Sequence, residues 1–374
     1  MGGCSRCACS CDSRQESNVT VRRAHIDDAD LMSWWNIAYE SGSLRRNTFF
    51  QSPAWNRTWI RHFIQTQHRR ELLLLLVEDS GNILALAPFY IQSMALGPIR
   101  AWRSIRWIAE RLAQYPDLLL VDGDAERVWL AIQQYISENM PDAWLSLSDV
   151  LPDSTAACMH GAAWKRMPGE VYYRLDLSVA RDGDLTDHVC AHMRREILRS
   201  RKRMESNPGL TWEYHEAPSQ EILRRLIELN RARFGTASWF HHERNIDFFL
   251  ELCQAGGKEI WCAVTRRDGE IADIIGGYMH DGSLLYVLSG MNSDHRSISP
   301  GTMNLDLTIR YAAAKGLHYF DFLRGDEAYK REFNPERRTS EHLQFMTQKA
   351  SRRYRIACGV RSAWKRLHGE RDHA

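Results

Sequence analysis

The side chains best suited to acid–base chemistry in this sequence gather between residues 318 and 334, in the segment HYFDFLRGDEAYKREFN. Aromatic residues alternate along its first part as they do in a strand, and its second part is a loop dense in charge. Such a run suits the exposed end of a strand that delivers polar groups into a cleft. An ordinary strand end followed by solvated charges has the same composition, so the preceding segment matters.

An anion site is predicted just before this segment. An apolar strand over 284–288 leads through a polar loop into a helix over 302–315. The free N–H groups and the dipole of a helix start favour an anion, although simple capping needs no ligand. Strand, helix and second strand together predict a βαβ unit with a cleft at the strand ends. Its anion-binding residues would be an arginine, a natural N-cap, a first-turn proline, a glycine that lets a ligand approach and the residue after it: Arg296, Ser299, Pro300, Gly301 and Thr302.

This order of motifs resembles the CelD-like acetyltransferases, a branch of the GNAT superfamily. The resemblance rests on the SPG loop at 299–301, the AxxxG motif at 312–316 and YFDFLRGDEAYK at 319–330, together with FxxPxW…W near the N-terminus, at Phe50, Pro53, Trp55 and Trp59. It implies an α/β protein with two tandem GNAT-like acyl-CoA N-acyltransferase domains, each a mixed central sheet flanked by helices. It also implies acetyl-CoA or another acyl-CoA as donor, and an amine of a small molecule, sugar or peptide as acceptor.

The same segment is similar to the FemAB-type peptidyltransferases, which also carry two GNAT-like domains. Tyr329 and Lys330 match their aromatic–lysine pair, and Phe333 matches a later phenylalanine. Asn334 stands where those enzymes usually have glycine, so the match is weaker than that to the CelD-like group. The alternative function that this similarity implies is a transferase that takes its donor group from aminoacyl-tRNA.

The roles of individual residues follow from the chemistry of amine acylation. The acceptor amine must lose a proton, and Asp321 or Glu327 is the candidate base. The thioester would lie between the diverging strands 284–290 and 318–323, where backbone N–H groups of the first strand stabilise the oxyanion. Tyr329 would protonate the leaving thiolate and Lys330 would stabilise developing negative charge. The acceptor itself is expected to contact Arg324, Asp326, Trp239 and His241.

An internal repeat predicts that the chain is a duplicated α/β unit. Residues 71–92 form two apolar runs joined by a turn, and 259–280 repeat that pattern. The strand, helix and strand within 115–150 are expected to correspond to those within 283–325, an offset of about 170 to 190 residues. Trp55, Trp59 and Phe63 fall on one helical face and are expected to be core.

The two copies differ at the helix that would bind the donor. The first copy has VDGDAER there, and carboxylates at a helix start complement the dipole and repel pyrophosphate. We therefore expect donor binding in the second copy alone. The predicted domains are a Cys-rich disordered leader over 1–17, a GNAT-like domain over 18–165 without a donor site, a GNAT-like domain over 166–348 with one, and a basic tail over 349–374.

Basic segments flank the second copy. The predicted helix over 186–206 contains MRREILRSRKRME; a solvated face is the simple explanation, and an anionic acceptor or RNA is the functional one. Residues 239–243, which carry Trp239 and His241, form either a mobile loop on the acceptor side or an aromatic-anchored connector. The basic tail either packs on the protein itself or makes peripheral contact with a membrane surface.

Composition limits the remaining possibilities. The chain has 374 residues, 44% of them hydrophobic, and a net charge of only +2, which argues against a general binder of nucleic acid. No apolar run is long enough to span a membrane and no signal peptide is visible, so we expect a cytoplasmic protein. The four cysteines of the leader lack paired spacing, and His188 and His192 lack a third ligand; no metal is expected.

Overall fold

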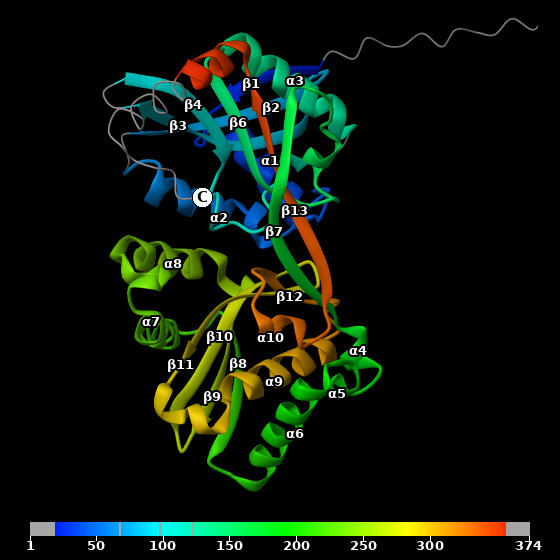
Figure 1. The fold of residues 1–374 in the computed structure, drawn as a ribbon, viewed down its shortest axis with the longest axis vertical. Coiled ribbons are helices and arrows are strands. Elements are labelled where there is room, and N and C mark those ends of the chain that lie inside the picture. Colours follow the sequence, from blue (N-terminus) through cyan, green and yellow to red (C-terminus); the bar gives the residue numbers. More distant parts are fainter. Residues whose placement is uncertain (1–18, 67–68, 97–98, 122, 357–374) are drawn as a thin grey trace, which may run out of the picture.

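The computed structural model describes residues 19–66, 69–96, 99–121 and 123–356 (Figure 1). These residues form a mixed sheet of 13 strands flanked by helices, which confirms the predicted fold class. The strand order is β1-β2-β3-β4-β6-β13-β7-β12-β11-β10-β9-β8, with β5 beside β3. The strands are β1 (Val19–Ala24), β2 (Arg70–Asp79), β3 (Asn82–Leu96), β4 (Ile99–Trp107), β5 (Leu119–Leu120), β6 (Ala143–Val150), β7 (Trp164–Asp176), β8 (Leu210–Glu216), β9 (Ile260–Arg267), β10 (Glu270–His280), β11 (Ser283–Met291), β12 (Tyr319–Arg324) and β13 (Glu336–Met346).

The helices pack on both halves of this sheet, and two of them join the halves. Trp55, Trp59 and Phe63 on α2 are buried, which confirms that their stripe is core, and Trp55 meets Phe248 of α8 edge to face at 5.5 Å. The helices are α1 (Ala29–Glu40), α2 (Pro53–Phe63), α3 (Ala125–Asn139), α4 (Ser178–Arg181), α5 (Leu185–His188), α6 (Ala191–Ser206), α7 (Gln220–Phe234), α8 (Glu243–Gly256), α9 (Pro300–Ala314) and α10 (Ala328–Arg331).

The two halves repeat one order of elements. Each runs strand, two helices, three antiparallel strands, helix, a strand parallel to the third, and a long final strand. Even the hairpin turns agree: Ser80 and Gly81 have φ of 51° and 84°, and Asp268 and Gly269 have 52° and 84°. Both central residues of each turn are thus in the left-handed region, as a tight hairpin requires. The predicted duplication therefore matches the order of elements.

One predicted correspondence within the repeat was wrong. The strand that pairs in parallel with β6 is β4, over Arg103–Ile105 and Ala143–Leu145, and not the run at 115–121. That run contributes only the two-residue strand β5, which pairs with β3. The misassignment has a physical reason, because β4 carries an arginine at every third position and resembles a buried strand less than the run LLLV does.

The final strand of each half is exchanged. β7 follows β6 in the chain but pairs with β12 and β13, and β13 follows β12 but pairs with β6 and β7. The two long strands run side by side from one half to the other (Figure 1). As a result, each half is completed by a strand that the other half supplies.

Some predictions fall outside the described residues: the leader over 1–17, Asp122, and the tail beyond residue 356. The part of the tail that is described is helical from residue 348 to residue 356. Across the described ranges, none of the helices combines the length and the apolar character needed to cross a membrane.

Candidate active site

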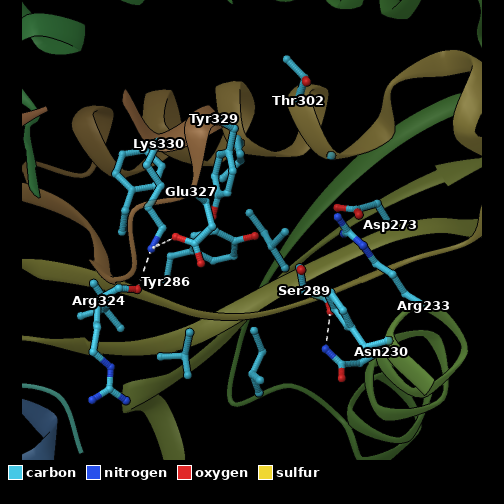
Figure 2. A pocket seen from close by; sticks show the side chains of 18 of the residues that line it. Asn230, Arg233, Asp273, Tyr286, Ser289, Thr302, Arg324, Glu327, Tyr329 and Lys330 are labelled. Carbon is cyan, nitrogen blue, oxygen red and sulfur yellow. Dashed lines mark hydrogen bonds and ion pairs between the residues drawn. The ribbon is translucent and has the colours of Figure 1, made fainter. Parts of the chain in front are cut away.

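A cavity of about 570 Å³ opens in the second half where β11 and β12 separate (Figure 2). The two strands pair in parallel only from Ser283 to Leu285, opposite Tyr319 to Asp321. Beyond that point a gap opens between them, bounded by α7, α9 and α10. The first half contributes Gln114, whose side-chain oxygen accepts a hydrogen bond from the Arg324 backbone N–H at 3.2 Å.

The wall of the cavity formed by β11 carries a β-bulge. Its register with β10 shifts between Gly276 and Gly277, so that one residue of β11, Val287, has no partner opposite. A Cβ at Gly277 would lie 1.8 Å from the carbonyl oxygen of Leu285, so a side chain does not fit there. Bulges of this kind redirect backbone groups next to functional sites.

The backbone of Ser289 points toward the cavity. Its carbonyl oxygen accepts a hydrogen bond from the side chain of Asn230, on α7 beside the cavity, at 2.7 Å (Figure 2). The N–H and C=O of one residue point to the same edge of an antiparallel strand, so the Ser289 N–H also faces the cavity. Gly290 makes this approach possible, because a Cβ there would lie 2.8 Å from Cβ of Leu229.

The start of α9 lies at the other end of the cavity and lacks a side-chain cap. Ser299 occupies the N-cap position, as predicted, but in the left-handed conformation (φ 52°, ψ 53°), and its hydroxyl makes no capping bond. Pro300 is the first helical residue, as expected. Gly301 and Thr302 line the cavity, and in the described chain their N–H groups have no protein partner. Such a helix start favours an anion.

A buried carboxyl, Asp273 of β10, lies beside this helix start and was not predicted. Its Oδ2 accepts a hydrogen bond from Asn304 at 2.9 Å, and its Oδ1 lies 3.8 Å from the position a Cβ would take at Gly301. Burial raises the pKa of Asp273 to about 7, although Asn304 and Arg233 act in the opposite direction. The sequence contained one signal, a lone carboxylate within the apolar strand pattern of 270–280.

The predicted residues of α10 gather at the end of the cavity nearest β12. Lys330 is 3% exposed, and its Nζ lies 2.7 Å from the carbonyl oxygen of Arg324 and 2.8 Å from the Glu327 carboxylate. Burial raises the pKa of Tyr329, and the neighbouring Tyr286 and Glu327 raise it further, so the phenol stays protonated at neutral pH. Figure 2 shows Tyr329, Lys330 and Glu327 together and Asp273 beside Arg233.

Asp321 does not join this group. It lines a different cavity, where its Oδ2 accepts a hydrogen bond from Tyr115 at 2.6 Å, and burial raises its pKa. Its Oδ1 accepts from the backbone N–H of Leu323 at 2.7 Å, and Leu323 has a φ of 59°. A positive φ is unusual for leucine. Asp321 therefore holds the kink in β12 and shapes the active-site cavity from behind.

Of the predicted acceptor residues, only Arg324 reaches the cavity. It also joins the halves, because its guanidinium lies 3.2 Å from Asp149. Asp326 is exposed and bonds the Tyr173 hydroxyl. The other predicted residues lie away from the cavity: Trp239 packs on Phe240 and Phe248, while His241 and Arg296 are exposed. The packing of Trp239 favours the interpretation of residues 239–243 as an aromatic-anchored connector over that of a mobile loop on the acceptor side.

The basic helix α6 borders the cavity through Met193. Several of its cations have internal partners: Arg201 pairs with Asp184 and Asp306, and Arg203 donates to the Ile298 carbonyl at 3.1 Å, next to the start of α9. Lys202 and Arg195 are exposed and make no ion pair within the described residues. In that same part of the chain, no three His, Cys, Asp or Glu side chains group as a metal site would require.

Comparisons with known proteins agree with this geometry. Residues 191–331 match the family described as "Acetyltransferase (GNAT) domain", so this part of the chain is similar to the GNAT acetyltransferase domains. That match includes α6, the whole cavity-forming βαβ unit and α10.

Solved structures share the fold across both halves. FemX is 11% identical with a TM-score of 0.61, and the match covers 90% of this chain and 99% of FemX. A conserved protein of unknown function from Bacteroides thetaiotaomicron is 12% identical with a TM-score of 0.54, covering 88% of this chain and 99% of its own. At these identities the likeness concerns the fold. No curated protein sequence matches the chain.

Proposed function

We propose that this protein is an N-acyltransferase that moves an acyl group, acetyl in the simplest case, from acyl-CoA to an amine of a small molecule, a sugar or a peptide. The observation that carries the proposal is the cavity itself, which joins a gap between two parallel strands to a helix start with unsatisfied N–H groups. A long donor that carries a pyrophosphate and a thioester fits such a cavity.

The donor would lie along the gap. Its pyrophosphate accepts hydrogen bonds from the N–H groups of Gly301 and Thr302, where the dipole of α9 is positive. The thioester lies between β11 and β12, and its carbonyl oxygen faces the N–H of Ser289. That donor stabilises the oxyanion when the carbonyl becomes tetrahedral.

Two side chains at the β12 end would move the protons. The acceptor nitrogen attacks the thioester carbon, the C–N bond forms, and the C–S bond breaks. Glu327 takes the proton that the nitrogen loses, because it is the carboxylate that lines this end of the cavity. Tyr329, which stays protonated at neutral pH, donates its proton to the departing thiolate.

Lys330 would position this machinery. Its ammonium group is already bound by the carbonyl oxygens of Arg324 and Gly325 and by Glu327. It therefore ties the end of β12 to α10 and orients the Glu327 carboxylate. We assign it this role in place of direct stabilisation of charge on the substrate.

A second candidate function is transfer from aminoacyl-tRNA. The observation in its favour is α6, where the exposed Arg195 and Lys202 lie on the helix that borders the cavity through Met193. Exposed cations beside a cavity suit a phosphate backbone. Activity that disappears after ribonuclease treatment would support this candidate, whereas a CoA-dependent enzyme would be unaffected.

The decisive experiment is calorimetric titration of acetyl-CoA and CoA into the wild type and a Gly301→Glu variant. The new carboxylate would face the pyrophosphate, so we expect affinity to fall by about 100-fold or more. Ala314→Glu is the matched control, because it places the same charge at the exposed far end of α9 and should leave affinity nearly unchanged.

The outcomes separate the two candidates. Binding to the wild type that is lost only in Gly301→Glu supports a CoA enzyme with its donor site at α9. If well-folded wild type binds neither acetyl-CoA nor CoA, the acyl-CoA proposal is wrong, and charged tRNA becomes the donor to test.

A further inference from the structure

A second cavity, of about 460 Å³, lies between the two halves of the molecule. The first half supplies the loop 45–48, Tyr115, Asp153 and, through its exchanged strand β7, Arg174; the second half supplies residues of β10, β11, β12 and β13. We call it the inter-half cavity. Asp321 and Tyr115 line it, whereas their neighbours Leu323 and Gln114 line the active-site cavity, so the two cavities are adjacent.

Three of the four arginines that line the inter-half cavity are held in place by ion pairs. Arg46 and Arg338 have side chains that are 9% and 12% exposed, and each lies within 2.6 Å of the same carboxylate, Asp153. Arg46 also contacts the buried Asp117 at 3.2 Å. Arg174 stacks on the Tyr319 ring at 4.2 Å and pairs with Glu336 at 2.8 Å. Their positions are therefore set before any ligand arrives.

These arginines keep hydrogen-bonding capacity. A guanidinium has five N–H donors, and Asp153, shared between Arg46 and Arg338, occupies few of them. Arg45 lines the same cavity, is exposed, and makes no ion pair in the part of the chain that is described. The other lining carboxyls compensate only partly: burial raises the pKa of Asp321, which favours its neutral form, and Asp281 is exposed at the rim.

Two further lining residues have buried polar atoms without a partner. Oδ1 of Asn47 is unpaired, although its amide nitrogen donates to the carbonyl oxygen of Tyr39 at 2.9 Å. Nε2 of His280 is also unpaired, although its Nδ1 lies 2.6 Å from Glu259. Buried polar atoms are rarely left without a partner in a native protein. Two of them beside one cavity indicate that a polar ligand belongs there.

We propose that the inter-half cavity binds a small molecule through a carboxylate or phosphate group held by Arg46, Arg174 and Arg338. Arginine is suited to this role because its planar fork binds two oxygens of an oxyanion at once. Asn47 and His280 would bond other polar groups of the same molecule. Because both halves supply the walls, the site exists only when they are assembled. The proposal does not depend on the identity of the acyl donor.

The test is calorimetric titration of inorganic phosphate and of glutarate into the full-length chain. Every protein carries Gly301→Glu, so that phosphate cannot bind at the start of α9. Arg338→Gln and Arg174→Gln each remove one cation from the cavity, and we expect binding to weaken by about tenfold or more in each. Arg337→Gln is the matched control, because this exposed neighbour on β13 does not line the cavity.

The two probes distinguish the chemistry of the ligand. Binding of glutarate alone indicates a carboxylate ligand, and binding of phosphate alone indicates a phosphate ester. Saturable binding that weakens in both cavity variants but not in Arg337→Gln supports the proposal. The proposal fails if neither probe binds the folded protein, or if Arg338→Gln and Arg174→Gln bind as tightly as the background protein.

Discussion

The two halves of this molecule share an order of elements but differ at the helix start that would face a donor. In the first half, Asp124 caps α3 and accepts a hydrogen bond from the N–H of Glu126 at 3.0 Å. In the second half, Ser299 makes no such bond, and Gly301 takes the position that Glu126 has in α3. The first helix thus provides its own negative charge, whereas the second leaves its N–H groups for a ligand.

The gap between the parallel strands differs as well. β4 and β6 also pair over only three residues, Arg103 to Ile105 opposite Ala143 to Leu145. In that half, however, a buried aromatic cluster packs beside the strands, with Trp129 of α3 lying 5.9 Å from Trp107 and 6.3 Å from Phe89 between ring centroids. One backbone plan therefore yields core in one half and a cavity in the other, according to side-chain volume and the charge at the helix start.

The largest expected effect comes from Trp129→Ala, which removes the central ring of the aromatic cluster in the first half. We expect a loss of about 3–5 kcal/mol in the free energy of unfolding, because a large buried ring leaves a cavity. Urea denaturation measures it. Acetyl-CoA should still bind with a stoichiometry of one, since Asp124 and Glu126 remain at the start of α3. Binding of a second acetyl-CoA would show that aromatic packing alone prevents the first half of the wild type from binding the donor.

The next largest effect concerns Glu327 and Asp321, the two carboxylates that the sequence analysis predicted as candidate bases. Glu327→Gln should lower kcat by about 100-fold, because the group lines the reacting end of the active-site cavity. Asp321→Asn should change kcat by no more than about threefold, because an amide oxygen can still accept the Leu323 N–H. Steady-state kinetics on folded protein compares them. The reverse order of effects would move the base to Asp321.

The smallest expected effect is a pH dependence of donor binding. It comes from Asp273, which lies beside the start of α9 in the second half. Below pH 7 Asp273 is mostly protonated and neutral, and above it a negative charge faces the start of α9. We therefore expect the Kd of CoA to rise by about tenfold or less between pH 6 and pH 8.5. Titrations across this range measure the slope. Asp273→Asn keeps the shape of the side chain without its charge, so the Kd of CoA should vary less with pH in this variant. If the variation is unchanged, it arises from titration of CoA itself.

Asp273 also bears on stability. Its pKa in the folded protein lies above the usual value of 3.8, so the folded state holds a proton that the unfolded chain releases between about pH 4 and pH 7. Stability from this group is therefore present at low pH and lost as pH rises through 7. The same Asp273→Asn variant should be more stable than wild type at pH 8, which thermal unfolding would detect.

Local patterns in the sequence determined much of this protein. Spacing on α2 predicted a buried stripe, paired turn residues predicted two equivalent hairpins, and the SPG loop predicted the start of α9. These features depend on interactions between residues that are close in the sequence, so local composition and periodicity are enough to predict them. The aromatic alternation likewise predicted the strand β12, in which successive side chains point to opposite faces of the sheet.

Only the tertiary structure decided which distant residues meet. Asp273 reaches the start of α9 because that helix packs on β10. Arg174 and Arg338 of the inter-half cavity lie close together because the exchanged strands β7 and β13 pair with each other. Strand partners far apart in the chain leave no local signal, since backbone hydrogen bonds are the same whichever strand accepts them. The sequence therefore predicted the parts of the site, and the packing of the two halves determined which of them act together.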